Sequence, residues 1–360
     1  MARLSDVGKI ITGNTPKTSD ALNYSSNDIC FVKPSDILDG EITMLTDSEF
    51  YISEYARHNA RILPPKSVLV TCIGIIGKVS INNVECAFNQ QINAIIPDTS
   101  KCLTEYLAYA IKNKQKEMQD IANAPVVPIL NKTQFSEIEI ELPSIESQTE
   151  VVAKIRAVGN LISLRKQQLS KLDELVKSRF IEMFGDYKTN SKGFDCKKGS
   201  ELFKFSSGKF LPEEKRIGSG VPVYGGNGIA WYTEEALIDF PTVVIGRVGA
   251  QCGNIHAVTT PVWITDNAIY IKEQKTTAYT LEFLTELMRM MDFYQYADFS
   301  GQPKITQKPL ETLEYIMPPL ELQKKYTAFV EQIDKSKLEI QKSLEKLETL
   351  KKALMQKYFG

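Results

Sequence analysis

The stretch SRFIEMFG at residues 178–185 returns at the end of the chain as MQKYFG at residues 355–360. When Gly185 is aligned with Gly360, 175 positions later, the preceding sequences superimpose without a gap. Self-similarity at one long period indicates a duplicated unit. The identical pairs include Phe184 with Phe359, Leu175 with Leu350, Leu172 with Leu347, Leu169 with Leu344, Gln148 with Gln323, Glu146 with Glu321 and Pro143 with Pro318.

Each copy of the repeat ends in an amphipathic segment. Apolar residues return every seventh place from Ile155 to Met183, with mostly polar residues between them, which is a heptad seam. We expect helices over about residues 147–184 and 322–359, each roughly 57 Å long at about 1.5 Å per residue. They should pack on each other as an antiparallel coiled coil, although each could instead cover its own domain. The predicted seam residues are Ile155, Ile162, Leu169, Leu172, Val176, Ile333, Ile340, Leu344, Leu347 and Leu354.

The repeat continues upstream more faintly. VTCIGIIGKVSI (70–81) resembles VVIGRVGAQCGNI (243–255), and LTEYLAYAIKN (103–113) parallels TLEFLTELMRM (280–290) as a short amphipathic helix. The runs SEIEIEL and LETLEYI are strand-like, and a proline follows each of them before the long helix. We therefore predict an α+β fold with a pseudo-twofold internal repeat, in which two β-rich domains are separated by two long helices. The predicted boundaries are 1–143 for the first domain, 144–185 for the central helix, 186–318 for a linker and the second domain, and 319–360 for the C-terminal helix.

Composition sets broad limits. With 360 residues, of which 43% are hydrophobic, the chain can bury more than one core. A net charge of -1 means that any nucleic-acid binding must depend on local patches. Six scattered cysteines and two distant histidines indicate a reduced, cytoplasmic protein without a metal site. No apolar run approaches the roughly 20 residues that cross a bilayer, so we expect no membrane span.

Recognisable catalytic motifs are missing. GIIGKVS (74–80) has the wrong spacing for a P-loop, and Val79 stands where a Ser or Thr must hold magnesium. PEEK (212–215) fits a solvated turn better than a nuclease centre. The sequence therefore indicates a binding protein. It leaves open an adaptor that binds protein rather than DNA, and an enzyme with an unfamiliar site.

Several segments resemble one family. SRFIEMFGD after a heptad helix, ELPSIESQ and MPPLELQ before such helices, and VPVYGGNGIAWY (221–232) look like the specificity (S) subunit of type I restriction-modification systems. The resemblance implies two target-recognition domains that each read one half of a split DNA target. It also implies that the helices set the spacer and dock two methyltransferase (M) subunits, with two restriction (R) subunits when present. S-adenosylmethionine, ATP and Mg²⁺ would then belong to those partners, and this chain would bind no cofactor and catalyse nothing.

Candidate DNA contacts follow from side-chain chemistry and position. Asn and Gln suit adenine edges, Arg and Lys suit guanine, and glycines let backbone approach DNA closely. An ordinary solvated surface, or a plain hairpin turn at YGGNG with Asn227 at positive φ, would explain many of these residues equally well. In the first domain the candidates are Lys17, Thr18, Lys33, Ser35, Lys78, Asn89, Gln90 and Gln91. In the second domain they are Lys209, Arg216, Tyr224, Asn227, Trp231, Tyr232, Arg247, Gln251 and Lys304.

Overall fold

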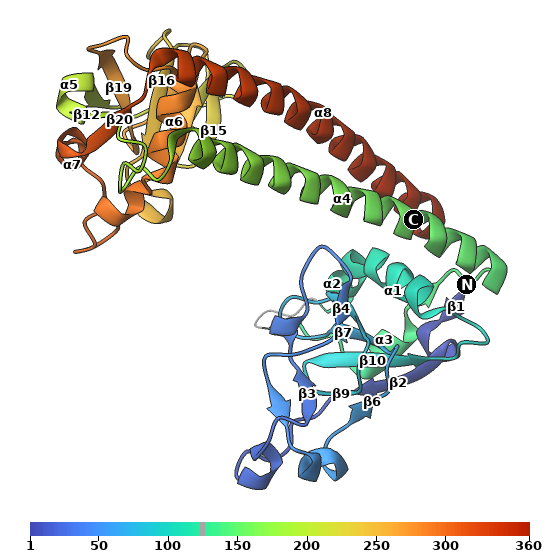
Figure 1. The fold of residues 1–360 in the computed structure, drawn as a ribbon. Helices are drawn as coiled ribbons and strands as arrows, with labels where there is room; N and C mark the ends of the chain where they lie inside the picture. Colours follow the sequence, from blue (N-terminus) through green and yellow to red (C-terminus); the bar gives the residue numbers. More distant parts are fainter. Residues whose placement is uncertain (123–126) are drawn as a thin grey trace. The chain divides into compact units, whose positions relative to one another are not determined.

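The computed structural model describes residues 1–122 and 127–360 of the chain (Figure 1). The chain folds into two compact units. Unit 1 comprises Met1–Leu164 with Leu344–Gly360, and unit 2 comprises Arg165–Ser343. The division falls inside both long helices. Each globular part therefore takes a portion of each helix into its own unit, and neither helix forms a unit by itself.

The described part of unit 1 contains three sheets and three short α-helices. The five-stranded sheet has the order β2 (Gly8–Thr12), β10 (Ile92–Pro97), β7 (Val68–Thr71), β8 (Val79–Asn82) and β4 (Thr43–Leu45). The four-stranded sheet has the order β5 (Tyr51–Ile52), β3 (Ile29–Val32), β9 (Cys86–Phe88) and β6 (Ile62–Leu63). The remaining elements are the pair β1 (Ala2–Arg3) with β11 (Glu139–Ile140), and helices α1 (Thr104–Asn113), α2 (Gln115–Ile121) and α3 (Lys132–Glu137).

Unit 2 repeats this plan. Its four-stranded sheet has the order β13 (Phe203–Ser207), β19 (Ala268–Gln274), β16 (Thr242–Gly246) and β17 (Ile255–Val258). Its three-stranded sheet has the order β15 (Gly228–Thr233), β14 (Val221–Gly225) and β18 (Trp263–Ile264). The remaining elements are the pair β12 (Asp195–Lys198) with β20 (Glu314–Met317), and helices α5 (Gly199–Leu202), α6 (Leu281–Met290) and α7 (Gln307–Thr312).

The internal repeat is therefore confirmed as a repeat of topology. The antiparallel series β2–β10–β7–β8 corresponds to β13–β19–β16–β17. In both units a helix of ten residues follows the second strand of that series, α1 after β10 and α6 after β19. A short helix and a short strand then lead to a long helix. The α+β prediction is correct.

The long helices α4 (Ile145–Phe184) and α8 (Leu320–Phe359) each contain 40 residues and begin two residues earlier than predicted. In unit 1 the start of α4 shares a core with the end of α8, since Ile155 clusters with Leu354 and Phe359. In unit 2 the end of α4 shares a core with the start of α8, since Phe180 clusters with Tyr326. The helices are thus antiparallel within each unit, and Figure 1 shows them running alongside each other.

All ten predicted seam residues are at least half-buried. The buried ones are Ile155, Ile162, Val176, Ile333 and Leu344, and the half-buried ones are Leu169, Leu172, Ile340, Leu347 and Leu354. Lys337, which occupies a seam position, places its ammonium nitrogen 2.6 Å from a carboxylate oxygen of Asp173 on α4. Lys337 interrupts the apolar row of α8, and this ion pair provides its positive charge with a partner on α4.

The two similar helix endings have a packing explanation. Phe184 ends α4 in the core of unit 2, where its ring centroid lies 4.7 Å from that of Phe283 on α6. Phe359 ends α8 in the core of unit 1, where its ring centroid lies 5.1 Å from that of Tyr106 on α1. Both phenylalanines are buried. The two long helices therefore have similar C-terminal sequences because each helix contributes its last phenylalanine to the core of one globular part.

The two runs predicted as strands before the prolines are only partly strands. SEIEIEL (136–142) begins inside α3 and LETLEYI (310–316) begins inside α7. In the first case Asn131 and Gln134 form a capping box that starts the helix. The strands are shorter than predicted for this reason. No helix in the described part of the chain is long and apolar enough to cross a membrane.

Candidate nucleic-acid interface

A glycine holds the loop after the first main strand in both units. The Gly13 N–H donates to the Ile92 carbonyl over 3.1 Å, and the Gly208 N–H donates to the Ala268 carbonyl over 3.1 Å. A Cβ atom would lie 2.1 Å from a carbonyl oxygen at Gly13 and 2.2 Å from one at Gly208. Only glycine fits such a close approach. Both loops are therefore held against the turn that precedes β10 or β19.

The segment KPSD (33–36), which carries the predicted residues Lys33 and Ser35, and the segment GGNG (225–228) lie at equivalent places. The Asn89 N–H donates to the Val32 carbonyl over 3.1 Å, and the Thr265 N–H donates to the Tyr224 carbonyl over 2.9 Å. Lys33–Asp36 and Gly225–Gly228 follow directly after those two carbonyl residues. Two segments selected separately from the sequence are thus structural counterparts.

A third turn joins the same end of each sheet. The Cys72 N–H donates to the Gln91 carbonyl over 2.8 Å, and the Arg247 N–H donates to the Asn267 carbonyl over 2.9 Å. Gly74 and Gly249 follow at φ values of 77° and 76°. The same backbone frame therefore presents four loops in each unit. They are the loops that follow Gly13 or Gly208, Val32 or Tyr224, and Cys72 or Arg247, and the turn that begins at Asn89 or Thr265. The side chains on that frame differ.

Four of the predicted residues in unit 1 line one cavity of about 380 Å³. The Lys33 ammonium lies 3.0 Å from the centroid of the Phe50 ring. Asn89 donates through Nδ2 to Gln91 Oε1 over 3.0 Å. Gln90 is exposed and accepts from the Thr15 hydroxyl over 2.7 Å. The four predicted residues in the cavity wall are Thr18, Lys33, Asn89 and Gln91.

The structure gives Lys78 an internal partner. Its ammonium donates to the carbonyls of Pro34 and Ile37 over 3.1 and 2.9 Å. Lys78 therefore anchors the loop that carries Lys33. Lys17 and Ser35 are exposed on the loops beside the cavity.

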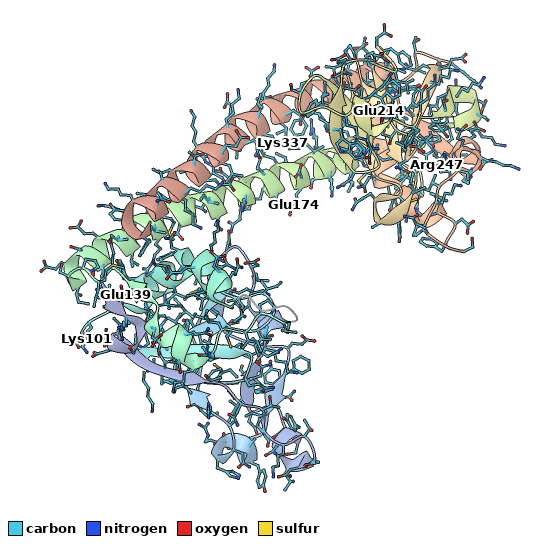
Figure 2. All side chains as sticks on the ribbon, turned by 180° about the vertical axis from the view of Figure 1, so that it is seen from behind. Lys101, Glu139, Glu174, Glu214, Arg247 and Lys337 are labelled. Atoms are coloured by element: carbon cyan, nitrogen blue, oxygen red, sulfur yellow. The ribbon has the colours of Figure 1, made fainter. Side chains whose placement is uncertain are left out.

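In unit 2, Arg247, which is labelled in Figure 2, follows directly after strand β16. Its Nη1 lies 3.5 Å from the Ser207 hydroxyl and 3.3 Å from the Asp266 carbonyl, and its side chain is half-buried. Asn254 donates to Gln251 Oε1 over 2.5 Å and to Asn227 Oδ1 over 3.5 Å. The backbone of Lys304 bridges to Val248 next to Arg247. Arg247, Asn227, Gln251 and Lys304 therefore belong to one group.

Trp231 and Tyr232 lie on strand β15 of the hairpin that β14 and β15 form, and Arg216 lies before that hairpin. The Arg216 guanidinium stacks on the Trp231 ring, with 4.1 Å between the guanidinium carbon and the ring centroid. The backbone of Tyr232 pairs with that of Ile217. The hairpin prediction for YGGNG is correct, but Gly228 rather than Asn227 has the positive φ, of 93°.

Two features of the loop after Gly208 bear on recognition. Lys209 is exposed, and its carbonyl accepts from Trp263 Nε1 over 2.9 Å. Phe210 is 64% exposed, and it was not among the residues selected from the sequence. The sequence could have pointed to Phe210 only through its position next to Lys209 and shortly after Gly208. The exposure of its ring depends on the fold.

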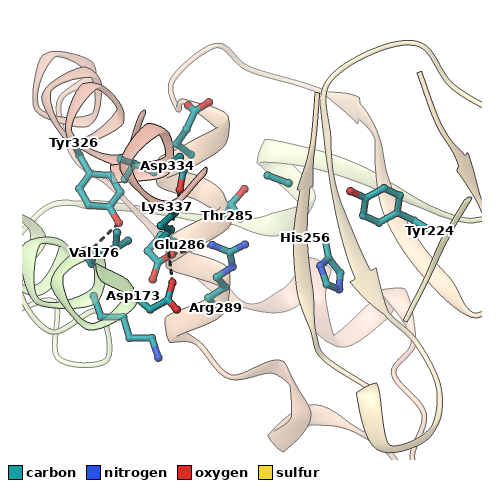
Figure 3. Close-up of a pocket in the computed structure, with 14 residues that line it drawn as sticks. Asp173, Val176, Tyr224, His256, Thr285, Glu286, Arg289, Tyr326, Asp334 and Lys337 are labelled. Carbon is teal, nitrogen blue, oxygen red and sulfur yellow. Dashed lines mark hydrogen bonds and ion pairs between the residues drawn. The ribbon is translucent and has the colours of Figure 1, made fainter. Parts of the chain in front are cut away.

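Tyr224 lines a different cavity of unit 2, of about 540 Å³ (Figure 3). The same cavity receives His256 from β17, the pair Glu286–Arg289 from α6, and Lys337 from α8. Glu286 and Arg289 lie 3.2 Å apart, and Glu286 is buried. Burial lowers the pKa of His256 below its usual value, with the positive charge of Arg289 adding to this effect. The Tyr224 side chain therefore lines this cavity, while the Tyr224 carbonyl belongs to the backbone frame of the loops.

The described residues offer no recognisable centre for metal or thiol chemistry. No group of three or more His, Cys, Asp or Glu side chains in residues 1–122 and 127–360 is arranged to hold a metal ion. Burial raises the pKa of all six cysteines, and that of Cys86 reaches about 12. A cysteine nucleophile needs the opposite shift.

Comparison with known proteins gives a consistent result. The profile of the family described as Type I restriction modification DNA specificity domain matches residues 1–174 and 191–352. The MjaIX type I restriction enzyme specificity subunit of Methanocaldococcus jannaschii is 27% identical over 59% of this chain and 53% of its own length. The EcoprrI specificity subunit of Escherichia coli is 23% identical over 92% of this chain and 86% of its own length. The chain thus spans about half the length of the first of these relatives.

The fold also matches a solved structure. The crystal structure of the type I restriction-modification S subunit from M. genitalium superimposes with a TM-score of 0.63 at 16% identity. The superposition covers 99% of this chain and 95% of that one. The two chains therefore share a fold over nearly their whole length.

Proposed function

Because the chain belongs to the family of type I restriction-modification DNA specificity domains, we propose that it selects the DNA sequence for a type I restriction-modification complex. Each globular domain reads one half of a bipartite target in double-stranded DNA. The antiparallel helices set the spacer and dock two methyltransferase subunits, and two restriction subunits join when they are present. Membership of this family favours DNA over the protein-binding adaptor considered from the sequence.

One observation carries the proposal. Both units present four loops on the same backbone frame, yet the side chains at equivalent places differ. Lys33 corresponds to Gly225, Asn89 to Thr265, and Cys72 to Arg247, because their backbone hydrogen bonds match. Two identical domains would suit a palindrome, whereas different side chains on one frame suit two different half-sites.

The chemistry then belongs to the partners. S-adenosylmethionine, ATP and Mg²⁺ bind to the methyltransferase and restriction subunits, and this chain supplies recognition alone. The absence of recognisable catalytic motifs from the sequence supports that division of labour.

Co-expression with a methyltransferase subunit tests the proposal. Sequencing of methylated DNA from such cells should reveal one bipartite motif that is missing when the present chain is left out. The purified chain alone should transfer no methyl group. Methylation by the isolated chain after exhaustive purification, or an unchanged methylation pattern without it, contradicts the proposal.

A matched pair of variants tests the interface. Arg247→Ala should weaken binding to the methylated motif by about 1–3 kcal/mol if its guanidinium reads a guanine edge. Arg3→Ala, at an exposed arginine outside the loop cluster, should leave binding unchanged. Equal effects of the two substitutions would remove Arg247 from the interface.

A further inference from the structure

The cavity among the first-domain loops combines aromatic rings with side-chain amides. Its volume is about 380 Å³, within the range of roughly 300–1,000 Å³ typical of small-ligand sites. Phe31, Phe50 and Tyr51 supply aromatic rings, and Asn89 and Gln91 supply amides. A planar, polar-edged ligand suits such a lining, because ring faces hold the plane and amides pair with the edge.

The aromatic lining of the cavity contains one exposed ring, that of Phe50, and one buried ring, that of Phe31. Phe31 is 2% exposed and forms part of a packed cluster, whereas Phe50 is 39% exposed. The Tyr51 hydroxyl is hydrogen-bonded to Asp47, which holds its ring in place. The Lys33 ammonium occupies the face of Phe50 at 3.0 Å from the centroid. An aromatic face that attracts a cation is also a face on which a base can stack.

The amides are positioned in advance. Asn89 is buried, its Oδ1 accepts from the Gln91 N–H over 3.1 Å, and its Nδ2 donates to Gln91 Oε1 over 3.0 Å. The first bond holds the Gln91 backbone and the second holds its side chain, which leaves Gln91 Nε2 without a protein acceptor within residues 1–122 and 127–360. One lone pair of Oε1 also stays available. A glutamine with a free donor and a free acceptor matches the bidentate edge of adenine.

We propose that this cavity binds a single nucleobase that has left the stack of the target duplex, with adenine as the base it fits best. A stacked base presents only its groove edges, so its ring face cannot meet the exposed ring of Phe50. As the base stacks on Phe50, Lys33 leaves that ring and its ammonium meets the DNA backbone. The inference rests on the proposed function, since it identifies what one DNA-reading domain does with one base.

The test uses the full chain in complex with its methyltransferase subunit and the duplex found by methylated-DNA sequencing. In a series of duplexes, the nucleotide opposite each base of the first-domain half-site is replaced in turn by an abasic site. An orphaned base leaves the stack at a lower cost. At one position, binding should tighten by about tenfold or more. Phe50→Ala and Gln91→Leu should each remove that gain.

Tyr55→Ala, at an exposed aromatic of the same domain outside the cavity, provides the matched control and should keep the gain. A gain that survives Phe50→Ala and Gln91→Leu comes from the methyltransferase subunit and overturns the inference. Absence of a gain at every position also overturns it, while sequence-specific binding by the unchanged complex leaves the proposed function standing. Loss of all specific binding by that complex overturns both. Thermal unfolding of each variant shows whether the chain is still folded.

Discussion

Gln148 and Gln323 make the same set of hydrogen bonds in the two units. Gln148 Nε2 donates to the carbonyls of Lys101 and Pro143 over 2.9 Å each, and its Oε1 accepts from the Leu103 N–H over 2.9 Å. Gln323 makes the corresponding bonds to Ala278, Pro318 and Thr280, at 2.9, 2.8 and 2.9 Å. Both glutamines are fully buried. Each therefore ties the first turn of a long helix to the segment that enters a globular helix, α1 or α6.

Replacing either glutamine by leucine should lower the free energy of unfolding by about 1–3 kcal/mol, since the substitution leaves one N–H and two carbonyls in a partly buried region without their partner. The two losses should be similar because the bonds are similar. Chemical denaturation of Gln148→Leu and Gln323→Leu measures them, with Gln167→Leu at an exposed site of α4 as control. If only one of the two variants lost stability, the two glutamines would be equivalent in geometry but not in their contribution to the free energy of unfolding.

Truncation along the α8 seam should follow burial rather than heptad position. Leu344 is 6% exposed, so Leu344→Ala should cost about 2–5 kcal/mol. Leu347 is half-buried and should cost less, and Leu350, at 46% exposed, should cost least. Equilibrium unfolding of the three variants gives the order. Equal costs would indicate that the helices pack differently in solution.

Acidification should destabilise the fold through His256. Burial lowers the pKa of this imidazole, so the unfolded chain binds a proton that the folded chain resists. Stability therefore rises with pH up to the region near the ordinary histidine value of 6.5 and falls as pH drops below it. The slope stays below roughly 1.4 kcal/mol per pH unit, because one group titrates and solvent screens its half-buried ring.

Denaturation between about pH 7.5 and 5.5, on either side of the ordinary histidine pKa, measures this effect. His256→Gln should flatten the change in the free energy of unfolding over that interval. His58→Gln, at an exposed histidine, is the matched control and should keep it. An unchanged pH dependence in His256→Gln would assign the acid sensitivity to other groups.

Lengthening both helices should change the spacer of the DNA target and leave its half-sites alone. One heptad inserted after Leu169 and another after Leu344 add about 10.5 Å to each helix at about 1.5 Å per residue. This corresponds to at most roughly three base pairs at about 3.4 Å per step. Sequencing of methylated DNA from cells that carry the insertion gives the result. Altered half-site bases with an unchanged spacer would refute the role of the helices.

Exchange of residues 186–318 for the corresponding domain of a relative should have the opposite effect. One half-site should change while the spacer and the other half-site persist, because base reading and spacing reside on different elements. The methylated motif is again the measurement. A change in both half-sites would show that the two domains do not read independently.

The order of residues along the chain is enough to predict the repeat, the two long helices and the residue types at the ends of strands. Identity at one offset and an apolar residue at every seventh place are properties of that order, so they are visible without coordinates. The seam from Ile155 to Leu354 and the closing phenylalanines Phe184 and Phe359 belong to this class. The choice of KPSD and YGGNG as candidate contacts also came from residue type and position.

Which of these residues act together depends on the folded chain. Backbone bonds between distant segments bring Lys33 to Asn89 and Gln91, and the same kind of bond places Gly225–Gly228 at the matching position. Two predicted residues have side chains with other roles: Lys78 anchors a loop, and Tyr224 lines a different cavity. Burial, exposure and partner choice depend on neighbours that the fold supplies from far along the chain, and no local pattern encodes them.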